Sequence, residues 1–592
     1  MTSTVFALKH PEKGSEYTMS PSMYPSTTPQ KNSMYQEIYN TADNTVGGTL
    51  VKQAVRHGNR PAIIDAKNNE IITFSELNEI SKTVAKALLK LGVAHNEHVA
   101  IWGPNTTKYL YVMYGVAKAG APLTTLNPGH KALEMEYTLN QSDSTVLFIC
   151  DNTFTSAENI ATLYEMCPEL KTASKGNIKT EKIPKLKHII SLGENPHPGM
   201  LTWSEFIKLA DEVTDEELLE RETLINPQDI FLIQYTSGTT GTPKGALVSH
   251  NAILASARTS VARQQLTPDD INMLPQPFFH SYGCGCIINA LFSASALTTI
   301  DRFSPSEALK TIEKTKATFI YGTPTMYIAL LNAMKEHKYD LSSLRSGTSG
   351  GAVCPPEIGK AVIEKIGVKH FAVSFGSTET LNVTMGSVED PVEKRITTMG
   401  TPLPHTEVKI IDIKTGETIT DETPGELLVR SSSLMTGYYK MPQETKNVLE
   451  PTGWYHTGDL VSRDKDGYYQ IMGRIKNVII RGGENIYPSE VENFLYTHPA
   501  VAGAQVVAFP SYYYGEEPVA FVRLKPEMTA TEAELKDYCK QNIAYFKVPI
   551  HIFFVEDYPQ TTSGKIQKFK LQEMAKELVP NAESAKKENP KK

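Results

Sequence analysis

Short apolar runs alternate with longer amphipathic segments over most of this chain. Residues 75–93 carry apolar side chains at helical spacing, and Ser75 is placed to cap the first turn of a helix. The apolar runs 98–104 and 144–151 predict strands, and residues 107–120 between them predict another helix. This strand–helix–strand rhythm is typical of an α/β domain with largely parallel sheets.

The pattern changes near residue 472. Glycine-rich turns fill residues 472–488, and a helical segment, two strands and another helix follow them. The order predicts a small mobile α+β domain at the C-terminal end. We therefore expect a disordered tail, a large domain, the small domain and a charged tail, at residues 1–40, 41–475, 476–580 and 581–592.

Composition narrows the possible classes of protein. A chain of 592 residues is too long for a single core, so more than one domain is expected. The formal net charge of −7 gives no electrostatic sign of nucleic-acid binding. The six cysteines show no CxxC pair and no partnering histidine cluster, which argues against a zinc site or a disulfide framework and fits a reducing compartment.

One uncharged segment, residues 281–300, has the length of a membrane-spanning helix. Ser, Thr, Asn, Gly and Tyr are scattered through it, so a buried helix in a soluble, intracellular protein is the favoured interpretation. The N-terminal residues lack a secretory apolar core, and the first arginine is Arg56, which is poor for a mitochondrial presequence. They do not decide between cytoplasm and mitochondrial matrix. Nothing in the sequence indicates the oligomeric state.

The stretch "IQYTSGTTGTPKGALVSH" places a polar, glycine-rich loop between two strand-like runs. Glycines let backbone N–H groups approach an anion closely, and hydroxyl side chains add donors, so the loop indicates a phosphate site. It does not match a P-loop, because Pro243 and Gly245 stand where that motif requires Gly and Ser or Thr. A strand, rather than a helix, is predicted to follow it.

Six motifs in order resemble the adenylate-forming enzymes, the family of acyl-CoA synthetases, luciferases and adenylation domains. They are "YTSGTTGTPKG", "PQPFFHSYG", "FGSTET", "GWYHTGDL", "GRIKNVIIRGGENIYPSEVE" and "TTSGKIQKFKL". The resemblance covers residues 41–579, and the late motifs are most similar to the medium-chain fatty acyl-CoA synthetase branch. It implies an acid–thiol ligase that uses ATP, Mg²⁺ and coenzyme A.

The resemblance assigns a set of residues to ATP and AMP. Phe375 is expected to stack on adenine, Gly350 and Gly351 to line its edge, and Asp459 to hold the ribose, with Arg474 reaching the ribose or a phosphate. Gly376 and Ser377 belong to the same motif as Phe375. The β- and γ-phosphates would lie against the loop residues Thr236, Ser237, Gly238, Thr239, Thr240, Gly241, Thr242, Pro243 and Lys244.

Four residues are expected to take part in the chemistry. By resemblance Lys565 bridges the attacking carboxylate and the α-phosphate, and Thr378 hydrogen-bonds that phosphate. Glu379 is expected to hold Mg²⁺, with Thr239 as a second oxygen ligand. His280 is expected to gate the acyl pocket and is not expected to bind a metal.

A domain rotation is implied for transfer to coenzyme A. Lys476 matches the family's hinge position, and Gly482 and Gly483 are expected to line the tunnel for the pantetheine arm. The expected acid is a monocarboxylic acid with a hydrocarbon tail, because the segments expected to line its pocket are apolar and small. A coumarate-type aromatic-acid ligase and a non-catalytic adenylate-binding scaffold remain alternatives.

Overall fold

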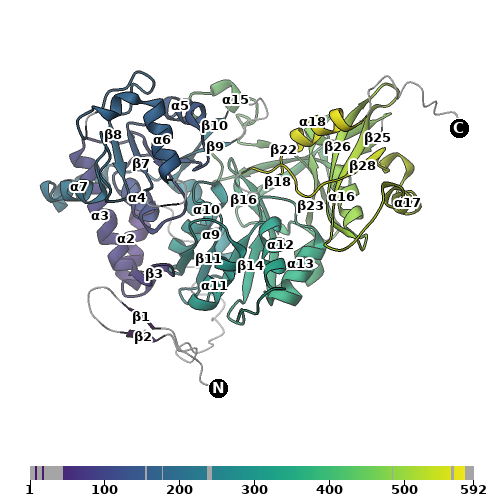
Figure 1. Ribbon diagram of the computed structural model, residues 1–592, viewed down its shortest axis with the longest axis horizontal. Helices are drawn as coiled ribbons and strands as arrows, with labels where there is room; N and C mark the ends of the chain where they lie inside the picture. Colours follow the sequence, from purple (N-terminus) through teal and green to yellow (C-terminus); the bar gives the residue numbers. More distant parts are fainter. Residues whose placement is uncertain are drawn as a thin grey trace.

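The computed structural model describes most of the chain. The described residues are 7–9, 16–18, 45–151, 153, 156–176, 178–236, 243–482, 484–561 and 566–579. Figure 1 shows them as a large body and a smaller C-terminal body that follows β23. Within the segment expected to be a disordered tail, the structure describes two short antiparallel strands, β1 (Ala7–Lys9) and β2 (Glu16–Thr18).

The first large sheet has seven strands, of which five are parallel and two extend one edge in antiparallel order. In spatial order they are β21 (Gly437–Tyr438), β10 (Lys244–Ser249), β9 (Ile230–Thr236), β6 (Leu123–Leu126), β5 (Val99–Trp102), β7 (Val146–Ile149) and β8 (His188–Ser191). β5, β6 and β7 are buried at every position because helices cover both faces of the sheet. Those helices include α4 (Thr107–Lys118), α5 (Ala132–Gln141) and α6 (Ser156–Met166).

The second large sheet has nine strands and is parallel from β3 to β15, with antiparallel strands at both edges. Its spatial order is β17 (Thr401–Pro402), β16 (Leu381–Met385), β15 (His370–Ser377), β14 (Ser346–Ser349), β13 (Phe319–Gly322), β11 (Ile271–Leu274), β12 (Ala296–Thr299), β3 (Pro61–Asp65) and β4 (Glu70–Thr73).

One apolar core joins the two large sheets. Residues of both sheets pack in it against α2 (Val46–His57), α3 (Phe74–Lys90), α4, α9 (His250–Gln264) and α10 (Ser281–Ser293). The remaining helices of the large body are α7 (Trp203–Lys208), α8 (Asp215–Thr223), α11 (Pro305–Thr315), α12 (Pro324–Ala333), α13 (Pro356–Ala361), α14 (Val392–Thr397) and α15 (Pro442–Lys446).

A third, five-stranded antiparallel sheet ends the large body. Its spatial order is β19 (Thr418–Ile419), β18 (Thr406–Ile411), β20 (Gly425–Ser431), β22 (Tyr455–Arg463) and β23 (Tyr469–Arg474). The sheet has its own apolar cluster, which includes Val383 and Met399 from the neighbouring nine-stranded sheet region. This shared cluster packs β22 and β23 against β15 and β16.

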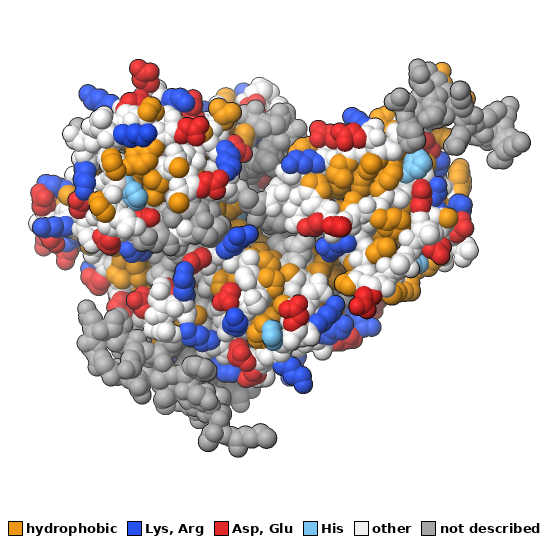
Figure 2. Space-filling view, viewed as in Figure 1, with side chains coloured by type: hydrophobic (Ala, Val, Ile, Leu, Met, Phe, Trp, Pro, Cys, Tyr) orange, Lys and Arg blue, Asp and Glu red, His pale blue; other side chains and the backbone are white. Residues whose placement is uncertain are grey.

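The small C-terminal body is α+β, as the sequence predicts. It has the strand order β25 (Glu484–Ile486), β24 (Ile479–Arg481), β27 (Gly515–Leu524), β26 (Val501–Ser511), with β28 (His551–Phe554) beside β27 and the helices α16 (Pro488–Tyr496), α17 (Glu532–Asn542) and α18 (Lys568–Leu578). Two apolar clusters lie entirely within it. On the face in Figure 2, hydrophobic side chains gather over this body near α18 and α16, and further hydrophobic patches lie among charged side chains over the large body.

Two sequence expectations change in detail. The cap of α3 is Thr73, not Ser75, because the Thr73 hydroxyl accepts from the Glu76 N–H while the Glu76 carboxylate accepts from the Thr73 N–H. The uncharged segment 281–300 is buried, but it divides into α10 and the strand β12. Across the described part of the chain, no helix is both long and apolar enough to cross a bilayer.

Candidate active site

Strands β9 and β10 hold the two ends of the predicted phosphate loop side by side. Thr236, the last residue of β9, is paired with Lys244, the first residue of β10. The Tyr137 hydroxyl of α5 donates to the Pro243 carbonyl oxygen at 2.8 Å. The strand–loop–strand arrangement expected from the sequence is therefore present. Ser237, Gly238, Thr239, Thr240, Gly241 and Thr242 lie outside the described residues.

Lys244 and Glu379 meet around one tyrosine. The Lys244 ammonium lies over the Tyr438 ring, 5.1 Å from its centroid, and the Tyr438 hydroxyl donates to Glu379 Oε1 at 2.8 Å. Burial, and after it the Glu379 charge, raise the pKa of Tyr438 above its usual value, so the phenol keeps its proton. Tyr438 thus contacts the Lys244 cation with its ring face and the Glu379 carboxylate with its hydroxyl.

Glu379 and Thr378 lie in a tight turn between β15 and β16. The Ser377 hydroxyl accepts from the backbone N–H groups of Glu379 and Thr380, both at 3.2 Å. A Cβ at Gly376 would lie 1.9 Å from the Leu381 carbonyl oxygen, so only glycine fits there. These contacts restrict the backbone conformation of the turn and so determine the position of Glu379.

The histidine motif reaches this turn from α10. His280 is the N-cap of α10, and its Nδ1 accepts from the Tyr282 N–H at 3.2 Å. The next residue, Ser281, has its hydroxyl 3.1 Å from the Thr378 hydroxyl. The structure therefore brings the His280 and Thr378 motifs together, although they are far apart in the sequence.

The predicted adenine residues lie at the ends of β14 and β15. Phe375 on β15 is half-buried and packs against the core of the third sheet. Gly350 follows β14, and a Cβ there would lie 2.9 Å from Ser374 Oγ and 3.2 Å from the Tyr282 ring. Gly351 has φ +79°, a conformation that favours glycine. Gly350 is thus closely packed beside Tyr282, whereas Gly351 is exposed.

Asp459 and Arg474 are direct neighbours across β22 and β23. Arg474 Nε lies 2.7 Å from Asp459 Oδ1, and an Arg474 Nη donates to the Thr457 carbonyl oxygen at 2.8 Å. Asp459 is only 3% exposed, so this ion pair holds a buried carboxylate at the edge of the site. Tyr455, four residues before Asp459 on β22, packs in one apolar cluster with Tyr438, so this strand lies beside the Glu379 cluster.

The predicted hinge and tunnel residues lie beyond this cluster. Lys476 is exposed, in a short 3₁₀ turn (Ile475–Asn477) directly after β23. Gly482 has φ +58° at the turn between β24 and β25, and its N–H donates to the Tyr514 carbonyl oxygen at 2.8 Å. Gly482 therefore belongs to the small body, whereas Glu379 belongs to the large body. Gly483 and Lys565 lie outside the described residues.

Sequence reasoning missed Tyr438, Tyr455 and the support around His456. His456 lies between the carboxylates of Glu426 and Glu450, at 3.1 and 3.0 Å, and Glu426 also accepts from the Gly458 N–H. Tyr438 lies in "GYY", and Tyr455 and His456 lie in "GWYH". Nothing in the spacing of these stretches indicates a contact with Glu379. Such long-range contacts become visible only in the fold.

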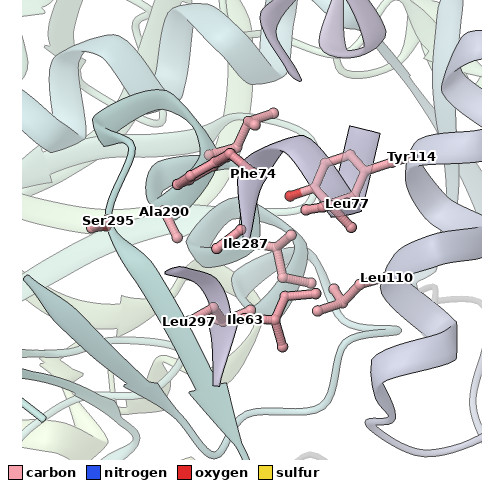
Figure 3. Close-up of a pocket in the computed structure, with 11 residues that line it drawn as sticks. Ile63, Phe74, Leu77, Leu110, Tyr114, Ile287, Ala290, Ser295 and Leu297 are labelled. Carbon is pink, nitrogen blue, oxygen red and sulfur yellow. The ribbon is translucent and has the colours of Figure 1, made fainter. Parts of the chain in front are cut away.

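A separate small cavity lies away from these residues. It measures about 10 Å³ and is enclosed by side chains of β3, α3, α4, α10 and β12, including Ile63, Phe74, Tyr114 and Ile287 (Figure 3). That volume holds at most one water molecule, and the lining is largely apolar. The cavity is a packing space in the core between the two large sheets.

Comparison with known sequences decides the family. The family model described as "AMP-binding enzyme" matches residues 50–439, and the one described as "AMP-binding enzyme C-terminal domain" matches residues 490–565. The chain belongs to the AMP-binding enzyme family. This finding confirms the adenylate-forming resemblance.

Curated relatives cover nearly the whole chain. The putative acyl-CoA synthetase YngI of Bacillus subtilis is 41% identical over 90% of this chain and 98% of its own length. The mitochondrial medium-chain acyl-CoA ligase ACSF2 is 38% identical in Rattus norvegicus and 36% in Homo sapiens, over 90% and 89% of this chain and 87% of each relative. The expected enzyme class, an acid–thiol ligase, is thereby confirmed.

Solved structures agree on the fold. The anthranilate CoA ligase AuaEII in complex with anthranoyl-AMP has a TM-score of 0.78 and 27% identity, over 90% of this chain and 98% of its own. ATP-bound MatB from Rhodopseudomonas palustris has a TM-score of 0.77 and 25% identity, over 90% and 99%. The expected α/β fold with a small C-terminal domain is confirmed.

Proposed function

We propose that this chain is an ATP-dependent fatty acyl-CoA synthetase that acts on medium-chain acids. The observation that carries the proposal is that Tyr438 joins Lys244 to Glu379 and packs in one cluster with Tyr455 of β22, the strand that carries the Asp459–Arg474 pair. From sequence motifs alone, Lys244, Asp459 and Arg474 were assigned to ATP or AMP and Glu379 to Mg²⁺. Their meeting at one place supports a nucleotide site.

The chemistry needs positive charge and alignment. A carboxylate is a poor acyl donor, so it first attacks the α-phosphorus of ATP, pyrophosphate leaves and an acyl-AMP anhydride forms. Two anions must approach each other, and a cationic, preorganised site lowers that barrier. We propose Lys244 for the terminal phosphates, Arg474 for the ribose or a phosphate, and Lys565 to bridge the reacting groups; the contacts of Lys244 with Tyr438 and of Arg474 with Asp459 support the first two.

Mg²⁺ fits the residues present. Among the described residues no group of three or more His, Cys, Asp or Glu side chains could hold a metal ion alone. Mg²⁺ characteristically uses one or two carboxylates together with nucleotide phosphates, which matches Glu379 beside the phosphate-loop strand. When bound, the cation would neutralise phosphate charge; Glu379 and Thr239 are its proposed protein ligands.

Transfer to coenzyme A is assigned to a rotation of the small body. Lys476 follows directly after Arg474 and Ile475 and stands between the two bodies, where a hinge would lie. Rotation would withdraw Lys565 and bring the turn containing Gly482 and Gly483 to the acyl-AMP. The thiolate then attacks the acyl carbon, and AMP leaves.

We propose that the acid lies against the aromatic and small side chains around Tyr282. The Tyr282 hydroxyl lies 3.1 Å from the Thr348 hydroxyl, and the Tyr282 and Tyr321 rings meet edge to face at 6.3 Å. Gly350 packs beside Tyr282. Such walls suit an uncharged tail, and the medium-chain ligase names of the ACSF2 relatives support a fatty acid. The anthranilate ligase neighbour favours an aromatic acid as the second candidate.

The deciding experiment is thioester formation by purified protein with ATP, Mg²⁺ and coenzyme A. The acids would run from short to long fatty acids and include cinnamic and anthranilic types, with Lys565→Ala as the control. We expect the highest kcat/KM at medium chain length and loss of pyrophosphate release in the variant. A preference for aromatic acids would select the second candidate. ATP binding without turnover of any acid would select the non-catalytic scaffold.

A further inference from the structure

Tyr438 contacts both Lys244 and Glu379 through its side chain. Its ring lies under the Lys244 ammonium, at 5.1 Å, and its hydroxyl is 2.8 Å from Glu379 Oε1. No sequence motif assigned it to the site. Resting on the proposed function, we propose that Tyr438 is a positioning residue that orients the Glu379 carboxylate toward the nucleotide-bound divalent cation and keeps Lys244 from pairing with it.

The backbone fixes Tyr438 relative to both partners. Tyr438 is paired with Ala246 of β10, two residues beyond Lys244. On the other side, the Met435 N–H donates to the Glu379 carbonyl oxygen at 2.8 Å. The segment from Met435 to Tyr438 therefore connects the phosphate-loop strand to the turn that carries Glu379.

Local hydrogen bonds restrict Tyr438 further. Its N–H donates to Thr445 Oγ1 at 2.9 Å, and the Thr445 hydroxyl donates to the Met441 carbonyl oxygen at 2.9 Å. Gly437 has φ +151°, and a Cβ there would lie 3.0 Å from Thr445 Cγ2. Tyr438 is 7% exposed, so its ring has few alternative positions.

A phenol suits this position chemically. A carboxylate has about four lone-pair sites, so a donor on Oε1 restricts the rotation of the Glu379 group and leaves other lone pairs for a cation. Outer groups that orient a metal-binding carboxylate commonly change metal affinity about 10- to 100-fold when removed. The ring face also contacts the Lys244 ammonium, so this cation is held by the ring rather than by the Glu379 carboxylate. Both charges are thereby available to the nucleotide and its cation.

The two roles can be separated by substitution. Tyr438→Phe keeps the ring under Lys244 and removes only the hydroxyl. Tyr438→Leu removes both. Tyr439→Phe is the matched control, because Tyr439 donates its hydroxyl to Asp143 at 2.9 Å on the α5 side. Glu379→Gln supplies the background in which the Tyr438 hydroxyl has no carboxylate to orient.

The first measurement is nucleotide binding by calorimetry, with Mg²⁺ and with EDTA, which needs no acid substrate. We expect wild type to bind ATP more tightly with Mg²⁺. In Tyr438→Phe, the ratio of ATP affinity with Mg²⁺ to ATP affinity in EDTA is expected to fall about tenfold, and the affinity in EDTA is expected to be unchanged. Tyr438→Leu should also weaken binding in EDTA, because Lys244 then pairs with Glu379. Equal Mg²⁺ dependence in wild type and Tyr438→Phe would overturn the proposal, as would wild-type ATP affinity that is indifferent to Mg²⁺.

The second measurement is ATP–pyrophosphate exchange with Mg²⁺ titrated. Tyr438→Phe should raise the half-saturating Mg²⁺ concentration about tenfold and leave the KM for the acid unchanged. The substitution should have no added effect in Glu379→Gln, whereas additive losses would contradict the orienting role. If wild type binds MgATP but exchanges no pyrophosphate with any acid, the proposed function fails, and calorimetry alone decides the role of Tyr438.

Discussion

Burial suppresses the charge of His250, which directly follows the last residue of β10. His250 is 1% exposed at the start of α9, its ring stacks on Phe231 and its Nδ1 accepts from the Val46 N–H at 3.2 Å. Desolvation lowers the pKa of His250 from 6.5 to about 4. The neutral ring is therefore part of the contact between α2 and α9.

This histidine makes stability depend on pH. Between pH 6.5 and about 4 the unfolded chain binds a proton at residue 250 that the folded chain does not bind. The free energy of unfolding should therefore fall by about 3 kcal/mol as the pH decreases through that window, and His250 adds no slope above it. Denaturant unfolding of wild type and His250→Gln at several pH values checks this. An equally steep decline in the variant would contradict the assignment.

Two glycines should respond oppositely to alanine. Gly376→Ala places a methyl group 1.9 Å from a backbone oxygen, so we expect a loss of about 1–3 kcal/mol in stability and of adenylation. Gly285 lies inside α10, and no neighbouring atom is within 4 Å of the position that an alanine methyl group would take, so Gly285→Ala should gain about 0.5–1 kcal/mol. Melting temperatures of both variants, with pyrophosphate exchange, test the pair. Similar shifts in both would refute the difference.

At the scale of elements, a buried ion pair joins α4 to α8. Lys118 is fully buried and its ammonium lies 3.0 Å from Glu222, which is partly exposed. Burial lowers the pKa of Lys118, and the Glu222 carboxylate partly restores it. The contact holds the polar helix α8 against the helical layer of α3 and α4.

Removing one partner should cost more than removing both. Glu222→Gln leaves a buried ammonium without its counter-ion, and we expect a loss of up to about 3 kcal/mol in the free energy of unfolding. The double variant Lys118→Met/Glu222→Gln should recover most of it, because no buried charge remains. Denaturant midpoints of the single and double variants measure this. A double variant no more stable than Glu222→Gln would rule out the charge explanation.

Element types were predictable where the periodicity was long. The buried strand β7 and the amphipathic helix α3 follow directly from their apolar spacing. The predicted cap of α3 was wrong because Thr73 and Ser75 both suit a cap, and only the reciprocal bonds with Glu76 decide between them. Segment 281–300 could not be divided from composition alone, because α10 and β12 are both buried and apolar.

At the scale of the molecule, the sequence predicted site residues only where a motif exists. Lys244, Glu379 and Asp459 were predicted because each belongs to a recognisable stretch; they lie on β10, in the turn between β15 and β16, and on β22, which belong to three different sheets. Tyr438 lies 59 residues from Glu379 in sequence, and neither periodicity nor composition signals their hydrogen bond. Contacts made by sheet packing need the tertiary structure. The roles of the predicted residues stay predictions until variants are measured.

The two bodies have separate apolar cores, so heating should unfold them separately. Both clusters of the small body use residues beyond 478, and the clusters of the large body end at residue 471. We expect two calorimetric transitions, and we expect a fragment ending at residue 474 to retain the larger one. That fragment should not form acyl-AMP, because it lacks Lys565. A single transition in the full chain that is absent from the fragment would show one cooperative unit.

The separation of the cores also has a consequence for evolution and engineering. A substitution inside one body can be absorbed by repacking there, so the two bodies can diverge at different rates. A chimaera can be built by joining the small body of a relative after β23. It must preserve only the few contacts between the two bodies, such as the 2.5 Å hydrogen bond from the Ser489 hydroxyl to the Met472 carbonyl oxygen. Acid preference and thiol handling could then be inherited, or exchanged, as independent modules.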